Sequence, residues 1–112
     1  MQADQLKQGI RRIEECADEA KRAVQQGSVP SELRQAVETL HQHASQAQQQ
    51  ANGQQQVGED GLRNAVLQME QQGDRAMQAC RNAGDSVDQQ TQQAVKRAHD
   101  EISGLKKQIQ MG

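Results

Sequence analysis

The spacing of the apolar residues constrains the fold of this chain more than any other feature. In the first segment, apolar residues recur at alternating steps of three and four positions. Such steps place side chains on one stripe of an α-helix, as in a heptad seam. Three later segments repeat the pattern, so we predict an all-α protein. The first seam consists of Ala3, Leu6, Ile10, Ile13, Ala17, Ala20 and Val24.

Start and stop signals divide the chain into helices. Gly27 favours the end of the first helix, and Pro30 suits the first turn of the second. Asn52-Gly53 predicts the next end, and the acids Glu59-Asp60 favour a new helix N-terminus. The expected helices span residues 2–26, 31–52, 59–83 and 86–110.

Two architectures are compatible with the residues around Gly84. Ser86 and Gln89 have the spacing of a capping box, which predicts a new helix and an antiparallel up-down bundle of four helices. A single interior glycine costs a helix only about 1 kcal/mol, however. Residues 60–110 could then form one helix about 75 Å long, packed on the first two as an elongated coiled coil. We favour four helices in one domain, residues 1–112, and the radius of gyration distinguishes the two.

The glutamine-rich stretch between Ala44 and Gly61 divides into helix and connection. The seam of the second helix shrinks here to Ala44, Ala47 and Ala51. Small residues allow a neighbouring helix to approach toward about 8 Å. We therefore predict a closely packed helix end, followed by a loop at residues 54–58 that joins two helical halves of one domain.

One internal similarity relates the second and third predicted helices. Leu33–Gln49 and Leu62–Gln78 match at an offset of 29 positions, with identities that include Leu33/Leu62 and Val37/Val66. A duplication would produce this match, and so would a shared heptad seam in a chain rich in glutamine and alanine. Both interpretations remain open from the residues alone.

The composition limits both the core and the classes of partner. Leu, Ile and Val number 17 and aromatic residues are absent, so the core is thin and a protein partner is expected: a second copy or another helical chain. Without aromatic side chains or a basic stripe among the 13 basic and 15 acidic residues, nucleic acid is not an expected partner. No apolar run reaches 18 residues, which argues against a membrane span, and the first residues lack a signal-peptide core, so a cytoplasmic location is expected.

The residues that carry chemistry do not form a recognisable catalytic or metal motif. His41 and His43 are two positions apart, so on a helix they face different sides. Cys16 and Cys80 lie at alanine-like positions and are expected to be reduced, and neither C-x-x-C nor H-x₃-H occurs. We therefore expect no enzyme activity, no cofactor and no metal.

The pattern favours a non-enzymatic interaction or structural protein that acts through helix faces. An alternative hypothesis is an amphipathic protein that coats a lipid or polymer inclusion, although the narrow, alanine-filled seams suit it less well. The residues predicted to form the helix-packing or interaction seam are Leu6, Ile10, Ile13, Leu33, Val37, Leu40, Leu62, Val66, Met69, Ile102, Leu105 and Ile109.

Overall fold

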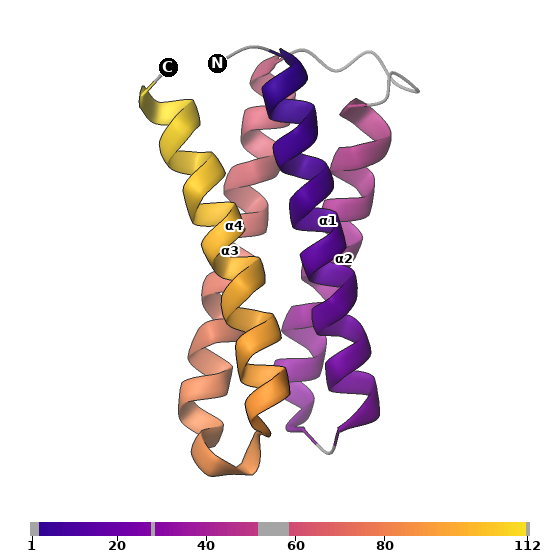
Figure 1. Cartoon of the computed structure of the whole chain (residues 1–112), viewed down its shortest axis with the longest axis vertical. Coiled ribbons are helices and arrows are strands. Elements are labelled where there is room, and N and C mark those ends of the chain that lie inside the picture. Colours follow the sequence, from indigo (N-terminus) through magenta and orange to yellow (C-terminus); the bar gives the residue numbers. More distant parts are fainter. Residues whose placement is uncertain (1–2, 28, 52–58, 112) are drawn as a thin grey trace.

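Four helices make up nearly all of the described chain. The computed structural model describes residues 3–27, 29–51 and 59–111, and no strand occurs in these ranges. The helices are antiparallel to their neighbours in the sequence, and α1 begins at the end of the molecule where α4 ends (Figure 1). The elements are α1 (Ala3–Gln26), α2 (Ser31–Ala51), α3 (Glu59–Ala83), the short 3₁₀ turn η1 (Gly84–Ser86) and α4 (Gln89–Met111).

The helices form the predicted four-helix bundle. Helix α1 packs on α2 and α4, and α3 packs on the same two helices from the opposite corner. The radius of gyration is 13.8 Å and the longest dimension is 41 Å. A compact chain of this length has a radius of gyration of about 13 Å. The alternative with three helices is wrong, because its long helix would span about 75 Å.

The chain reverses at η1, and this reversal differs from the prediction in detail. Gly84 has φ +58°, a left-handed conformation that interrupts the helix. Helix α4 begins at Gln89 and not at residue 86, and the expected capping box of Ser86 and Gln89 is wrong. The Ser86 hydroxyl instead donates to the carbonyl of Ala83 over 2.7 Å. Extended Val87 (φ −102°, ψ 128°) is buried in the core before α4 starts.

Asp88 occupies the capping position of α4. Its carbonyl accepts the Gln92 N–H over 3.0 Å, the first hydrogen bond of the helix type, and its carboxylate accepts the Thr91 hydroxyl. A short polar side chain just before the first turn is the usual N-cap. The other helix ends agree with the prediction to within one residue, except that residue 52 and the expected loop at 54–58 lie outside the described residues.

Two apolar clusters fill the bundle from end to end. One includes Ile10, Ile13 and Met69, and the other includes Val24, Leu33 and Val95, all fully buried. The narrow seam of α2 is also buried, and its alanines line both clusters. The core is therefore continuous but is built largely from small side chains, as the composition predicts.

Two glycines should respond oppositely to substitution by alanine. Gly84→Ala is expected to lower the free energy of unfolding by about 1–2 kcal/mol, because a side chain disfavours the left-handed φ of +58°. Gly104→Ala is expected to raise it by about 1 kcal/mol, since Gly104 lies inside α4 and a Cβ there would meet nothing within 4 Å. Urea denaturation of both variants measures the two effects, and equal signs would contradict this account of the reversal.

Candidate interaction face between α2 and α3

The structure places the predicted seam inside the molecule. Eleven of the twelve residues are buried, and Ile109 is partly buried against the first cluster. Within one chain these side chains pack against one another, so they are not on the surface of the closed bundle. Among the described residues, Leu67 is the exposed large hydrophobic side chain, at 43% exposure. Single exposed leucines are common and do not mark an interface, so a contact surface on the described part of the closed bundle is mostly polar.

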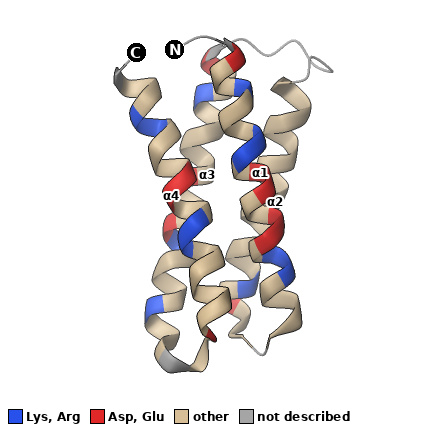
Figure 2. Ribbon diagram, viewed as in Figure 1, with Lys and Arg blue, Asp and Glu red and all other residues tan. Residues whose placement is uncertain are grey.

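Charge is unevenly distributed over the four helices. Helix α1 carries ten charged residues, whereas α2 carries three, of which Glu38 is the last. Figure 2 shows α1 and α4 at the front, each with both signs of charge. The second half of α2 thus presents amides, hydroxyls and imidazoles, without a full charge of either sign fixed on it.

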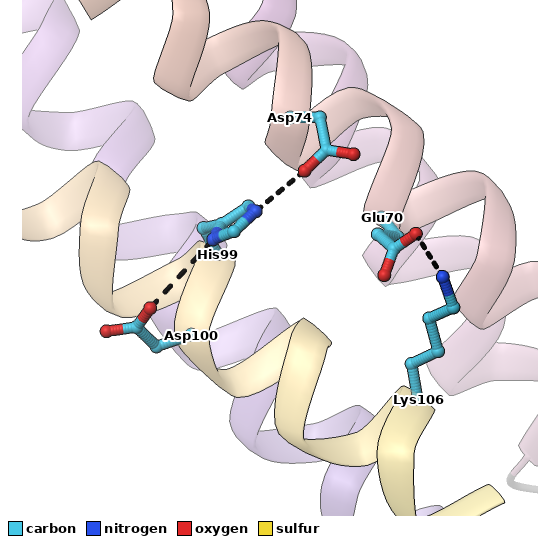
Figure 3. Close-up of polar contacts among 5 residues, drawn as sticks. All are labelled: Glu70, Asp74, His99, Asp100 and Lys106. Carbon is cyan, nitrogen blue, oxygen red and sulfur yellow. Dashed lines mark hydrogen bonds and ion pairs between the residues drawn. The ribbon is translucent and has the colours of Figure 1, made fainter. Parts of the chain in front are cut away.

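Ion pairs connect three of the four helix–helix seams. Arg97 of α4 lies 3.2 Å from Glu19 of α1, and Nε2 of His41 in α2 lies 3.5 Å from Asp18 of α1. Two further pairs join α3 to α4 (Figure 3). In the described ranges, no ion pair joins α2 to α3. The α2–α3 seam is held by apolar packing and is polar but uncharged over most of its outer side.

Two grooves follow one another along this seam. The first has a volume of about 330 Å³ and lies between the first half of α2 and the second half of α3. The second has a volume of about 220 Å³ and lies between the opposite halves. Together with the ridges between them they make up the surface that we call the α2–α3 face. The first groove is lined by Gln35, Ala36, Glu38, Thr39, Gln42, Gln72 and Arg75. The second is lined by His43, Gln46, Ala47, Gln50, Gly61, Asn64, Ala65 and Gln68.

One residue that lines each groove has a buried side-chain polar atom with no hydrogen-bond partner among the described residues. In the first it is Oε1 of Gln72, and in the second it is Nδ1 of His43. Buried polar side-chain atoms are bonded in the large majority of cases, and leaving one unpaired costs about 1–3 kcal/mol. A water molecule or a partner's side chain in the groove would supply the missing bond.

The internal similarity at an offset of 29 relates these two grooves. Adding 29 to three of the five α2 positions of the first groove gives α3 positions of the second, and both α3 positions of the first correspond likewise to α2 positions of the second. Gln72 and His43, which carry the two unpaired atoms, are themselves equivalent. Because α2 and α3 are antiparallel, the face has an approximate local two-fold axis. The equivalent pairs are Gln35/Asn64, Ala36/Ala65, Thr39/Gln68, His43/Gln72 and Gln46/Arg75.

The histidines and cysteines do not come together. As predicted, His41 and His43 face different sides of α2: one meets Asp18 of α1 and the other lines a groove beside α3. Cys16 and Cys80 are free thiols that belong to different apolar clusters. In the part of the chain that the structure describes, no three His, Cys, Asp or Glu residues are grouped to hold a metal ion.

Both thiols should make the stability fall at alkaline pH. Burial raises the pKa of Cys80 above its ordinary value of 9.0, and burial followed by the negative charge of Glu101 raises the pKa of Cys16. The folded chain keeps these protons after the unfolded chain has lost them. The free energy of unfolding should therefore be insensitive to the thiols below the ordinary pKa and decline as pH rises above it.

Urea denaturation between about pH 7 and pH 10 measures this decline. The chain has no tyrosine, which removes one competing titration. A Cys16→Ala/Cys80→Ala variant is the control, and its decline should be smaller because the contribution of the two thiols is gone and only the other titrating groups remain. Equal slopes for the two proteins would refute the link to the thiols.

Comparison with known proteins finds no relative of this chain. No protein-family model, curated protein or solved structure matches the chain. None of the helices in the described ranges has the length and apolar character needed to cross a membrane. The candidate site therefore rests on the geometry of the α2–α3 face alone.

Proposed function

We propose that this chain is a non-enzymatic interaction protein whose contact surface is the α2–α3 face. One observation carries the proposal: each groove of this face is lined by a residue whose buried polar atom has no partner among the described residues, Oε1 of Gln72 and Nδ1 of His43. A bound chain that inserts a polar side chain into each groove would satisfy both atoms. Among the described residues no ion pair crosses this seam, which supports the choice of face, since fewer of its described side chains are engaged in such pairs.

The chemistry of the face suits a protein partner that offers amides and hydroxyls. A glutamine or asparagine side chain both donates and accepts hydrogen bonds, so rows of amides can pair with similar rows. The first groove also contains one acid and one base, Glu38 and Arg75. Such a face is complementary to itself, so the first partner to test is a second copy of the chain. A different chain with polar, amide-rich helices is the second.

Self-association is tested by light scattering over a concentration series. The proposal expects the apparent mass to rise toward that of a dimer, and Gln68→Glu to weaken the association by placing like charges across the contact. Gln8→Glu is the matched control, because it makes the same change at an exposed site on α1. A chain that stays strictly monomeric and melts cooperatively would rule out self-association.

Contact with another chain is tested by photo-crosslinking inside the cell. A photoreactive residue at Gln46 lies on the α2–α3 face, and one at Gln8 lies on α1. We expect discrete crosslinked products from position 46 that are absent from position 8. If both positions give the same products, or neither gives any, the α2–α3 face is not the contact surface.

The coating of a lipid or polymer inclusion would require the bundle to open, because its apolar seams face inward. That alternative predicts binding to vesicles of anionic lipid together with loss of interhelix contacts. A chain that does not cosediment with such vesicles, and whose thermal transition is unchanged by them, excludes it.

A further inference from the structure

The pairing of charged side chains between α3 and α4 changes along the seam toward η1. Farther from η1, two bases of α4 face acids of α3: Nζ of Lys106 lies 2.7 Å from Oε1 of Glu70, and Nε2 of His99 lies 2.7 Å from Oδ1 of Asp74 (Figure 3). Nearer to η1, no further acid–base pair joins α3 to α4 among the described side chains. Arg81 follows Asp74 by about two helical turns on α3, and the facing part of α4 carries Lys96.

A groove of about 450 Å³ is lined by both of these bases. It is lined by Met77, Cys80, Arg81, Gly84, Gln89, Gln92, Gln93 and Lys96. This volume is within the range of about 300–1,000 Å³ that is typical of small-molecule sites. It is the largest of the three grooves described here, and it lies on the opposite side of α3 from the α2–α3 face.

Among the described side chains that line this groove, Arg81 and Lys96 are charged and none is acidic. Neither Arg81 nor Lys96 has an ion-pair partner among the side chains that the structure describes. Asp88, just before α4, does not line the groove, and its carboxylate accepts a hydrogen bond from Thr91. Two like charges that line one groove repel one another, and an anion between them would relieve that repulsion.

The rest of the lining provides polar contacts and an apolar floor. The Gln92 amide donates to the carbonyl of Val87 over 2.8 Å, which anchors one wall. Gln89 and Gln93 are exposed and can donate to a ligand. Cys80 is only 9% exposed. Gly84 has nothing within 4 Å of the place where a Cβ would lie, so the groove is open at its side.

We propose that this groove binds a small organic anion that carries a carboxylate or phosphate group. The anionic group lies between Arg81 and Lys96, and the body of the molecule lies against Met77 and Cys80. Arginine binds planar oxyanions through paired N–H groups, and lysine adds a second, mobile charge. This site is independent of the proposed contact with a partner protein, because it uses the α3–α4 seam and not the α2–α3 face.

The test is a titration of the ¹⁵N-labelled chain with inorganic phosphate and, separately, with citrate, each at constant ionic strength. We expect saturable shifts confined to the amides around Arg81, Gly84 and Lys96 for at least one of the two anions. Arg81→Gln and Lys96→Gln should each weaken binding about tenfold, as the loss of a charge-assisted hydrogen bond does. Saturation by phosphate alone identifies a phosphate site, and saturation by citrate alone identifies a carboxylate site.

Lys107→Gln is the matched control, because Lys107 is an exposed base of the same helix that lies outside the groove. It should bind as the unsubstituted chain does. The proposal is overturned if no saturation occurs below about 10 mM of either anion, or if the shifts spread over the whole surface. It is also overturned if Lys107→Gln weakens binding as much as Lys96→Gln. Circular dichroism and a thermal melt of each variant verify that the bundle is intact.

Discussion

Replacing Ile13 with alanine is expected to lower the free energy of unfolding by about 2–5 kcal/mol. Ile13 is completely buried, and it packs in the cluster formed by parts of all four helices. Removing most of its side chain loses apolar burial and leaves a cavity, because the surrounding helices close only in part. Five of the fourteen buried residues of this cluster are alanines, whose side chains are too short to fill the space. Small domains have a total stability of about 5–15 kcal/mol, so this one substitution should remove a large share.

The measurement is urea denaturation followed by circular dichroism, with the midpoint and slope compared at one protein concentration. Leu67→Ala is the matched control, since Leu67 is 43% exposed on α3 and its truncation should change stability by no more than about 0.5 kcal/mol. If the two substitutions cost the same, the buried seam does not hold the bundle together, and the monomeric fold described here is not the stable unit.

The class of fold follows from the sequence because helical periodicity and helix ends are local properties. The seam through Ile10 and Ile13 defines a buried stripe, and Gly27 and Pro30 delimit helices through the backbone angles they permit. The start of α4 was harder to predict. Ser86 and Asp88 are both good caps by type, and the choice between them depends on Val87, which packs into the core in an extended conformation. That packing is a tertiary contact, so local rules place the helix start three residues too early.

Most of the candidate site, the α2–α3 face, could not be predicted from the sequence, for a different physical reason. The apolar seam is the strongest pattern in the sequence, but in the closed bundle its residues are buried in the core and are not available to a partner. The α2–α3 face depends on which helices are neighbours and on which polar atoms remain unpaired between them. One signal was present: the similarity at an offset of 29, which pairs His43 with Gln72. This similarity predicts two related grooves only once α2 and α3 are known to be antiparallel neighbours, because then equivalent positions of the two helices line the two grooves.

Enlarging a side chain in the alanine seam of α2 should lower the free energy of unfolding about as much as truncating Ile13 does. Ala44 is completely buried in the same cluster. Ala44→Leu adds three carbon atoms at a position where the adjoining helices leave room for a methyl group. Overpacking typically costs about 1–3 kcal/mol and sometimes more, because backbones must move apart. Ala44 has no exposed surface, so the added atoms cannot reach solvent and must displace packed neighbours, and we expect the upper part of this range.

Gln49→Leu tests whether bulk at a buried position, and not leucine itself, is responsible. Gln49 is exposed on the same helix, and leucine is an equally good helix former, so this variant should differ from the unsubstituted chain by less than about 0.5 kcal/mol. Urea denaturation gives both values. An Ala44→Leu chain as stable as the Gln49→Leu chain would mean that α2 has free volume along its inner side. The small residues would then have to be explained by something other than close helix packing, such as an exchange of α2 between copies of the chain.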